Sequence, residues 1–284
     1  MITPVLLLLR PKQWIKNLLV LAPLFFAGKF TEIAAWQQGL LAMLAFIAVS
    51  SVVYIINDLR DVEEDRLHPV KKLRPLAAGS VTPLRAVLLA ALTTAAALFF
   101  LSQLPLACAV LLCVYLISNV LYTLVLKRHA LLDVFFIASC YVMRVLMGCY
   151  ALAVTVSPWI ILATFFLALF IAFSKRYHEV GIESYAASKP NLANYNHALL
   201  DRLVNVSGCA ALITYAIYTA EIAKHTGRVE IVYTTAFVAF GLFRYLQAVY
   251  VQGRGGEPET LLLTDRWQQV NLSLWLATTL WLMF

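Results

Sequence analysis

Charged residues are scarce in this sequence. Asp, Glu, Lys and Arg make up 13% of its 284 residues, and 62% of the residues are hydrophobic. An ordinary soluble domain is about 25% charged and about 45–50% apolar. So large an apolar excess cannot be buried in a single core, and it excludes a soluble globular enzyme, a disordered chain and a coiled coil. The class that remains is a polytopic membrane protein.

Cysteine patterns typical of metal sites and disulfides are also missing. The five cysteines lie in apolar segments without C-x-x-C spacing or a nearby histidine, so they are interpreted as small buried hydrophobes. A cleavable signal peptide is not evident, because the short apolar run 5–9 meets Arg10 and Lys12 rather than small residues. No zinc site or disulfide is therefore expected.

Long hydrophobic runs are abundant. A bilayer core about 30 Å thick needs about 20 apolar residues per helix, and this length predicts an all-α integral membrane protein with one domain over 1–284. Two long polar loops are predicted at 58–82 and 176–202. The nine predicted transmembrane helices cover 14–30, 36–57, 83–102, 104–126, 130–152, 157–175, 203–223, 229–250 and 267–284.

The positive charges predict the orientation. Seventeen Lys and Arg residues fall at the N-terminal end and after the even-numbered predicted helices, whereas the opposite connections hold Lys29, Lys224 and Arg228. By the positive-inside rule, the N-terminus and both long loops are expected in the cytoplasm, and nine crossings put the C-terminus on the other side. The net charge of +7 is thus assigned to cytoplasmic loops, and nucleic acid is not an expected partner.

Three carboxylates fall on one face where the second predicted helix reaches the cytoplasm. At 100° per residue, Asp58, Asp61 and Asp65 lie within a stripe about 60° wide. Carboxylates stacked in this way repel one another unless a cation lies among them, and hard oxygen ligands suit Mg²⁺ completed by substrate phosphates. We interpret the three as metal ligands, with Asn57 as a neutral neighbour. The alternative is a solvated acidic helix end neutralised by the basic loop that follows.

That basic loop carries the charge that a diphosphate needs. Cations beside a magnesium site neutralise the phosphate oxygens that the metal does not reach. Arg74, which precedes a proline, is the stronger ligand candidate. Lys71 and Lys72 fit an ordinary positive-inside loop equally well. Further along, Arg144 lies deep in the predicted helix 130–152, near the same face as Asp133, and must face a cavity or a polar partner.

The pattern N-D-x-x-D-x-x-x-D at 57–65, followed by K-K-x-R-P-L-x-x-G at 71–79, resembles the UbiA superfamily of intramembrane prenyltransferases. The resemblance covers essentially the whole chain. It implies a nine-helix bundle around a central cavity that opens to the cytoplasm, where two polar motifs bind Mg²⁺ and a prenyl diphosphate. The second family motif, D-R-x-x-D, is here K-R-Y-H-E at 175–179. The lysine weakens a second Mg²⁺ site and favours direct phosphate contact; the alternative is a helix-end ion-pair cluster.

Within that superfamily, K-R-x-x-E, R-P-K-Q-W-I-K-N at 10–17 and the segment 257–266 resemble the decaprenyl-phosphate phosphoribosyltransferase branch. This implies Mg²⁺-dependent transfer of 5-phosphoribose from phosphoribosyl pyrophosphate to a polyprenyl phosphate in a bacterial cytoplasmic membrane, with release of pyrophosphate. The ionised lipid phosphate is itself a nucleophile, so no catalytic histidine or serine is required.

The same resemblance implies the site residues. Asp58, Asp61 and Asp65 hold the metal, and Asp58, Asp61 and Lys175 are catalytic. Whether Lys175 and Arg176 hold the donor or the lipid phosphate stays open, as does homo-oligomer formation. The expected substrate-binding residues are Lys16, Asn17, Asn57, Arg74, Lys127, Arg176, Tyr177, Glu179, Tyr195 and Arg202, of which Tyr195 and Arg202 are candidates for a lid in the loop 176–202.

Two other functions are weighed against this one. The first is prenyl transfer from a polyprenyl diphosphate to an aromatic or other small acceptor, against which Lys175 argues. The second is an ion-coupled transporter or flippase. Carrier sites lie near the bilayer midplane between repeats, whereas the polar residues here concentrate at one membrane face and no inverted repeat is visible.

Overall fold

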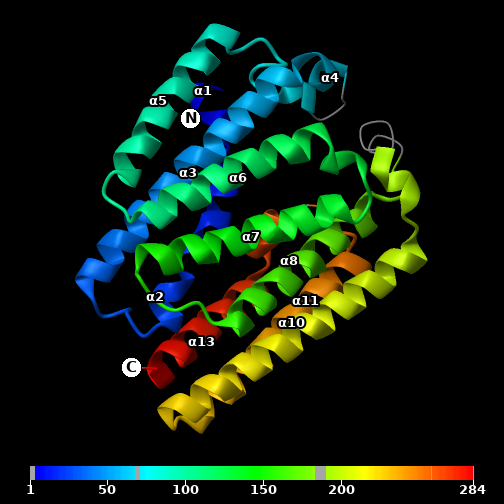
Figure 1. Cartoon of the computed structure of the whole chain (residues 1–284). Helices are drawn as coiled ribbons and strands as arrows, with labels where there is room; N and C mark the ends of the chain where they lie inside the picture. The colour runs from blue at the N-terminus through cyan, green and yellow to red at the C-terminus, as the bar shows by residue number, and fades with distance from the viewer. Residues whose placement is uncertain (1–3, 68–70, 183–189, 257, 284) are drawn as a thin grey trace. The chain divides into compact units, whose positions relative to one another are not determined.

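The computed structural model describes residues 4–67, 71–182, 190–256 and 258–283; Glu257 of the last motif lies outside these ranges. The described chain is helical and contains no β-strand, which confirms the all-α prediction. It divides into two compact units, described separately below and labelled by element in Figure 1. Unit 1 comprises Met1–Leu124 and Met143–Val154, and unit 2 comprises Val125–Val142 and Thr155–Phe284.

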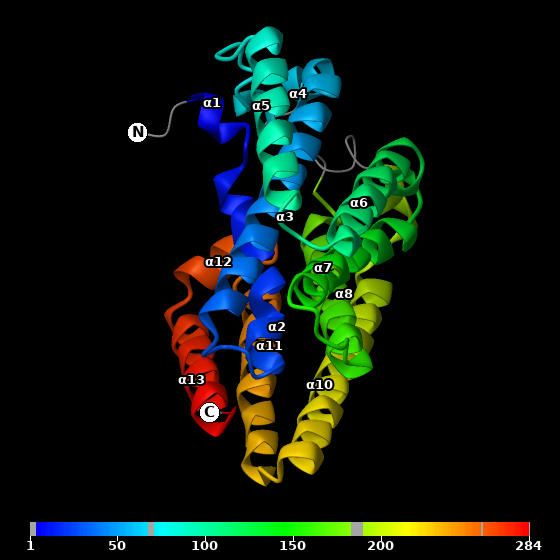
Figure 2. The same cartoon turned by 60° about the vertical axis from the view of Figure 1, so that its left-hand side comes forward.

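Unit 1 is built around the long helix α3, which packs along α5 (Figures 1 and 2). Thr82 caps α5 by accepting a hydrogen bond from the Arg85 N–H, and Pro83 begins the helix, where a missing N–H costs nothing. Small residues on α3, including Gly39, Ala42 and Ala45, are buried in the interior of the unit. The elements of unit 1 are α1 (Pro4–Leu7), η1 (Pro11–Leu21), α2 (Ala22–Phe26), α3 (Ile33–Arg60), α4 (Val62–Leu67), η2 (Lys71–Leu73), α5 (Pro83–Leu101), α6 (Leu106–Leu124) and the second half of α7 (Leu132–Ala151).

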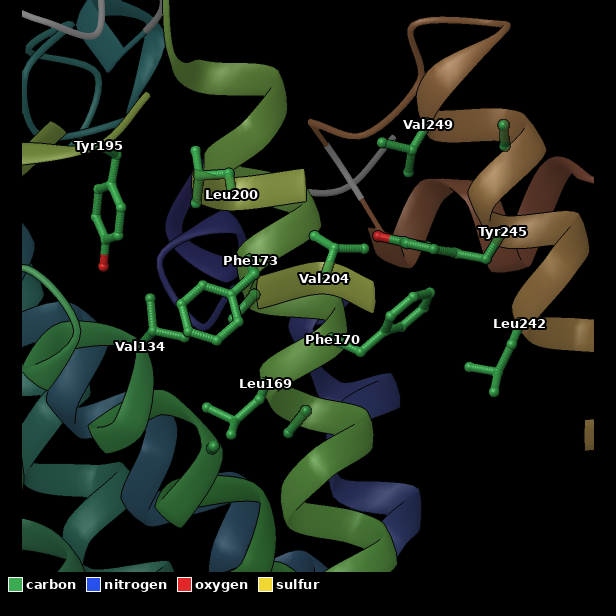
Figure 3. Close-up of a cluster of buried hydrophobic side chains, with 14 of the residues drawn as sticks. Val134, Leu169, Phe170, Phe173, Tyr195, Leu200, Val204, Leu242, Tyr245 and Val249 are labelled. Carbon is green, nitrogen blue, oxygen red and sulfur yellow. The ribbon is translucent and has the colours of Figure 1, made fainter. Parts of the chain in front are cut away.

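Unit 2 is held by a core between α8 and α10, with α11 against it. Phe170 of α8 lies 5.4 Å from the Tyr245 ring of α11, centroid to centroid, and Phe173 is 2% exposed. Figure 3 shows the Phe170 and Phe173 side chains near Leu200 and Val204 of α10. The elements are η3 (Leu126–Arg128), the first half of α7, α8 (Pro158–Glu179), η4 (Pro190–Asn194), α10 (His197–Thr226), η5 (Val229–Thr234), α11 (Thr235–Tyr250), α12 (Pro258–Thr264) and α13 (Arg266–Met283).

Seven helical segments within the described ranges are long and apolar enough to cross a membrane, and they match the second to eighth predicted helices. The multi-pass character predicted from the composition is thereby supported, whereas the number nine stays a prediction. The seven segments are Ile33–Arg60, Pro83–Leu101, Leu106–Leu124, Leu132–Ala151, Pro158–Glu179, His197–Thr226 and Val229–Tyr250.

The first and last predicted segments behave differently. Residues 14–30 do not form one α-helix, because η1 is a 3₁₀-helix that passes into the five-residue α2 with Pro23 at its start. Proline lacks the N–H that an α-helix interior requires. The segment 267–284 is helical, as α13, but its polar residues Gln268, Gln269 and Asn271 lower its mean hydropathy, and it is not among the seven.

Both long loops are shorter than predicted. α3 continues to Arg60 and α4 follows, so Asp58 lies in the last turn of a helix. α8 continues to Glu179, which puts the whole K-R-Y-H-E motif in its last turns. α10 already begins at His197, so Arg202 is a helical residue and not part of a loop, which corrects its expected place in a lid.

Candidate functional site

Two buried aspartates of unit 1 share one arginine. Asp58 and Asp65 are 3% and 2% exposed, and the guanidinium of Arg74 donates to both, at 3.1 Å and 2.6 Å. Asp58 reaches this point from the end of α3 and Asp65 from α4, while Arg74 follows η2. Both hydrogen bonds come from Nη1 of Arg74. The basic loop thus lies against the acidic helix end and neutralises it in part, as the alternative interpretation expects, and the assignment of these aspartates as metal ligands stays a prediction.

A second arginine joins them from the N-terminal segment. Arg10 donates to the same Oδ1 of Asp58 that Arg74 uses, and its guanidinium lies over the Tyr54 ring, 4.7 Å from the centroid. Lys71 stands 3.9 Å from Asp65. We call Arg10, Asp58, Asp65, Lys71 and Arg74 the acid–arginine cluster. Its three cations are about one-third exposed, so phosphate oxygens from solution can reach them.

Asp61 and Asn57 lie beside this cluster in a different arrangement from the predicted one. α3 ends at Arg60 and Asp61 is its half-buried C-cap, so the uninterrupted helical stripe of Asp58, Asp61 and Asp65 is wrong. The Asp61 carbonyl instead accepts the Asp65 N–H at 2.8 Å, which starts α4. Asn57 is half-buried and accepts from the Thr123 hydroxyl at 3.4 Å.

The fit of Mg²⁺ can be judged from this donor set. Among the described residues, no three His, Cys, Asp or Glu side chains gather closely enough to hold a metal ion. The acids present are hard oxygen donors, however, and Mg²⁺ needs one or two carboxylates plus water and substrate phosphates rather than a complete protein cage. Asp58 and Asp65 therefore suit Mg²⁺ that arrives with a diphosphate, whose oxygens also offer Arg10 and Arg74 new partners.

The second motif lies in a buried ion-pair network of unit 2. Arg176 of α8 donates to Asp133 Oδ2 from Nε at 3.1 Å and from Nη2 at 2.8 Å, and it also pairs with Glu179. Asp133, Arg176 and Glu179 are 0%, 6% and 2% exposed. Breaking a buried pair leaves a charge without compensation, which is strongly unfavourable. Arg176 and Glu179 are thus held by each other and by α7.

The segment after α8 completes this network. Asn191 donates to Asp133 at 2.8 Å, and the Tyr195 hydroxyl accepts the Leu131 N–H at 2.6 Å while lying 3.4 Å from Asp133. Burial raises the pKa of Tyr195 to about 12, so the phenol stays neutral at physiological pH. Tyr195 therefore fastens the chain before α10. We call Asp133, Arg176, Glu179, Asn191 and Tyr195 the α8 network.

The remaining predicted residues of unit 2 are more exposed. Lys175 and Lys127 are half-buried, and Arg202 is exposed on α10. Tyr177 stacks edge-on with His197 and lies 4.7 Å from the Tyr250 ring, centroid to centroid. Within the described chain, no ion pair forms at Lys175, Lys127 or Arg202, so these three cations can meet an anionic substrate.

The early polar pair of unit 1 separates into two roles. Asn17 is 1% exposed, and its Oδ1 accepts from Arg144 Nε at 3.0 Å. Asn17 is therefore the polar partner that Arg144 requires at its depth. The same guanidinium lies 4.8 Å from the Phe46 ring centroid. Asn17 is therefore engaged inside the unit. Lys16, one residue earlier, is half-buried on η1.

Sequence reasoning did not assign three residues that the structure brings to these clusters. Arg10 belongs to the motif 10–17 but was given no role of its own. It lies 48 residues before Asp58, so no local sequence pattern links the two. Asp133 stood out as an acid within the predicted helix 130–152, but the sequence offered Arg144 as its neighbour on the same helix. Asn191 carries no pattern at all.

These observations can be compared with known proteins. A model of the UbiA prenyltransferase family matches residues 18–262. The chain belongs to the UbiA prenyltransferase family. This UbiA chain is 32% identical to the decaprenyl-phosphate phosphoribosyltransferase of Mycolicibacterium smegmatis, over 95% of this chain and 89% of that protein. It is 33% identical to the protein of the same name from Mycobacterium tuberculosis, over 95% and 91% of the two chains.

A solved structure shows the same UbiA fold. It is a UbiA homolog from Archaeoglobus fulgidus bound to DMAPP and Mg²⁺, with a TM-score of 0.69, 23% identity and 98% of each chain covered. The family model and the relatives above confirm the family resemblance drawn from the first motif. In this UbiA chain, the first motif and the basic loop after it supply all of the acid–arginine cluster except Arg10. The second motif supplies Arg176 and Glu179 of the α8 network, next to Lys175.

Proposed function

We propose that this UbiA protein transfers 5-phosphoribose from phosphoribosyl pyrophosphate to a decaprenyl-like polyprenyl phosphate, with Mg²⁺ as cofactor and pyrophosphate as leaving group. The proposed location is the cytoplasmic face of a bacterial inner membrane, crossed nine times with the N-terminus in the cytoplasm. Two mycobacterial decaprenyl-phosphate phosphoribosyltransferases that match almost the whole chain support this assignment.

The observation that carries the proposal is the pairing of the carboxylates at the end of α8. Arg176 engages both Asp133 and Glu179, and Lys175 stands where prenyl-diphosphate users resembling this chain have an acid. Carboxylates held in a deeply buried pair with a guanidinium are poor ligands for a second Mg²⁺, unlike Asp58 and Asp65, whose partner Arg74 is 30% exposed. A lysine, in contrast, attracts phosphate directly. Phosphoribosyl transfer to a lipid phosphate requires a site where a metal holds the pyrophosphate and a second site where protein cations hold a phosphate directly.

The acid–arginine cluster is the proposed pyrophosphate site. Asp58 and Asp65 would hold Mg²⁺ that arrives with the pyrophosphate, and Asp61, beside them at the end of α3, is the proposed third ligand once the metal is bound. The metal would supply positive charge against the leaving pyrophosphate. Arg74 and Arg10 then turn their guanidinium groups from the aspartates towards pyrophosphate oxygens. Donors aimed at the charge that develops on the leaving group lower the barrier most. Asn57 orients this end of α3 through its contact with Thr123.

The acceptor needs charge compensation rather than a base. A phosphate monoester is ionised at neutral pH, so its oxygen bonds to the anomeric carbon of ribose as the bond from that carbon to pyrophosphate breaks. Lys175, Lys127 and Arg202 are the proposed phosphate-binding cations of unit 2, and Lys16 is that of η1. Tyr177 fixes the last turn of α8 through its aromatic neighbours. Arg176, Glu179, Asn17 and Tyr195 act as positioning residues, because their polar groups are engaged within the protein.

The direct test uses purified protein, radiolabelled phosphoribosyl pyrophosphate, Mg²⁺ and polyprenyl phosphate, with label followed into the lipid phase. We expect EDTA-sensitive lipid label with the wild-type protein, and its loss in Asp58→Asn and Asp61→Asn variants that remain folded in detergent. Full activity of both variants would contradict the metal assignment.

A second arm addresses the competing functions. The same preparation receives a labelled prenyl diphosphate with a small aromatic acceptor, and, after reconstitution into vesicles, a pH gradient. Prenyl transfer without any phosphoribosyl transfer would replace the proposed activity by that of a prenyltransferase. Gradient-driven lipid or ion movement without either transfer would indicate a carrier.

A further inference from the structure

A glycine-rich loop of unit 2 has no part in the two clusters described above. Residues 253–256, Gly-Arg-Gly-Gly, connect α11 to α12. Gly253 has a φ of +65°, a backbone conformation that other residues rarely adopt. The Arg254 N–H donates to the Ala248 carbonyl at 3.0 Å, which turns the loop back onto the end of α11. The loop is thereby fixed by its backbone, and the Arg254 side chain extends from it.

Two of its glycines press the loop against the end of α8. A Cβ atom on Gly256 would lie 2.8 Å from Cδ2 and 3.0 Å from Nε2 of His178. A Cβ on Gly255 would lie 3.1 Å from Cβ of His178 and 3.2 Å from the Ser174 carbonyl. Real Cβ contacts of this length are rare, so only glycine lets the loop backbone lie directly on the histidine of the K-R-Y-H-E motif.

A shallow cavity lies beside this contact. Its volume is about 220 Å³, it opens to solvent, and it is lined by His178, Gly253, Arg254, Gly256, Thr260 and Leu261. A water molecule occupies about 30 Å³ in the liquid. The cavity is therefore large enough for a phosphate group together with part of the molecule that carries it.

The described lining favours an anion. Arg254 is exposed and uses Nη2 to donate to the Thr264 hydroxyl at 2.6 Å, which aims the guanidinium while its other N–H groups remain available for further bonds. His178 adds an imidazole N–H. Among the residues whose side chains are described at this cavity, none is a carboxylate. Asp265 follows α12, but Arg244 binds it with Nε at 3.2 Å and Nη2 at 2.7 Å. The hydrogen bonds from Arg244 lower the pKa of Asp265, and the nearby charges of Arg244 and Arg254 lower it further.

We propose that this cavity, formed by the glycine loop 253–256 and the end of α8, binds the phosphate monoester group of a substrate through Arg254 and His178. The inference rests on the proposed function for the identity of that substrate, since both reactants carry such a group. It is either the 5-phosphate of phosphoribosyl pyrophosphate, remote from the reacting carbon, or the phosphate of the polyprenyl acceptor. Guanidinium binds phosphate with paired, charge-assisted hydrogen bonds.

Binding without turnover separates this inference from the proposed function. Full-length protein in detergent is titrated with ribose 5-phosphate, with pyrophosphate and with a short-chain polyprenyl phosphate, for the wild type and for Arg254→Gln, Arg254→Lys and His178→Gln. Lys224→Gln, which removes an exposed cation from the last turn of α10 in the same unit, is the matched control. The Michaelis constants of both substrates are measured in parallel.

The expected result is that Arg254→Gln weakens one phosphate monoester about tenfold or more, since a charge-assisted hydrogen bond contributes at least that factor. Arg254→Lys restores part of the loss, His178→Gln shows a smaller loss on the same ligand, and pyrophosphate binding is unchanged. Loss of ribose 5-phosphate binding with a raised KM for phosphoribosyl pyrophosphate assigns the cavity to the donor. Loss confined to the polyprenyl phosphate assigns it to the acceptor.

Unchanged affinity for both monoesters in a folded Arg254→Gln variant would overturn the inference while leaving phosphoribosyl transfer intact. Conversely, Arg254-dependent monoester binding in a protein that transfers no phosphoribose would keep the cavity and reject the proposed function. Gly256→Ala gives an independent check, because the added Cβ displaces the His178 ring. It is expected to weaken the same ligand, and normal binding by this folded variant would also contradict the inference.

Discussion

At the scale of single residues, the candidate site is organised by arginines that each serve two acids. Arg74 bridges Asp58 and Asp65, and Arg176 bridges Asp133 and Glu179. Their surroundings differ, because Arg74 is 30% exposed and Arg176 is 8% exposed in its side chain. The exposed bridge can exchange a carboxylate for a phosphate oxygen, whereas the buried bridge is part of the framework. The two arginines should therefore respond differently to substitution.

Replacing Arg74 by glutamine should impair transfer far more than folding. The variant keeps a hydrogen-bonding side chain but loses the charge opposite the leaving pyrophosphate, and removal of one such donor typically costs about 10²–10³ in kcat. Initial rates of label transfer and the thermal midpoint in detergent measure the two effects. Arg66→Gln is the control, because Arg66 pairs with the exposed Glu63 of the same segment. Equal rates for the two variants would remove Arg74 from the site.

Replacing Asp133 by asparagine should have the opposite effect to Arg74→Gln: it should mainly lower the stability of unit 2. Breaking a buried ion pair by removing one partner costs about 3–5 kcal/mol, and the lower end is expected because Glu179 still faces Arg176. Chemical unfolding followed by circular dichroism measures the loss.

Glu63→Gln is the matched change in an exposed pair, worth about 0.2–1 kcal/mol. If Asp133→Asn unfolds at the same denaturant concentration as Glu63→Gln, the α8 network does not stabilise the fold as described.

Which residues could be predicted depended on their distance along the chain. Asp58, Asp65 and Arg74 lie within one short segment, so a local pattern of acids followed by bases revealed them. Arg10 and Asp133 pair with residues 48 and 43 positions away, and the choice of partner is made by helix packing. An isolated acid or arginine in an apolar segment indicates that a partner exists without indicating which.

At the scale of helices, the apolar runs predicted the positions of the membrane-spanning helices well and their ends less well. Length and hydrophobicity suffice to place seven segments, since a membrane span must satisfy its backbone internally. The ends of α3 and α8 extend past the predicted boundaries, because charged side chains such as Arg176 find buried partners there. η1 is a 3₁₀-helix that packs against α3, and hydropathy describes neither its conformation nor this contact.

Close packing of α7 against the N-terminal segment in unit 1 gives a prediction at this scale. A Cβ on Gly148 would lie 2.0 Å from the Val20 carbonyl and 3.0 Å from the Pro23 ring. Gly148→Ala is therefore expected to lower the thermal midpoint, although Gly→Ala within a helix otherwise stabilises by about 0.8–1 kcal/mol.

Gly241→Ala is the control for this change. Its Cβ would meet the flexible amide ends of Asn271 and Gln268 at 3.2 Å and 3.5 Å, and these can move aside. A raised midpoint in both variants would show that the backbone contact at Gly148 is not as tight as described.

At the scale of the whole molecule, charge asymmetry predicts the orientation. Lys72, in η2, is expected on the cytoplasmic side, and Lys224, in the last turn of α10, on the opposite side. Single cysteines at these two exposed positions should react with a membrane-impermeant maleimide from opposite sides of sealed vesicles. The unsubstituted protein provides the background from Cys113 and Cys209, which are exposed on the protein surface. Labelling of both positions from one side would reject the orientation.

The identity of the lipid product tests the proposed activity most directly. Wild-type protein is incubated with phosphoribosyl pyrophosphate, polyprenyl phosphate and Mg²⁺, and the extracted lipid is examined by mass spectrometry. The predicted result is a new lipid heavier than the acceptor by one phosphoribosyl group, formed with one equivalent of pyrophosphate and absent when EDTA is present. Recovery of unmodified polyprenyl phosphate, with the same protein consuming a prenyl diphosphate instead, would contradict it.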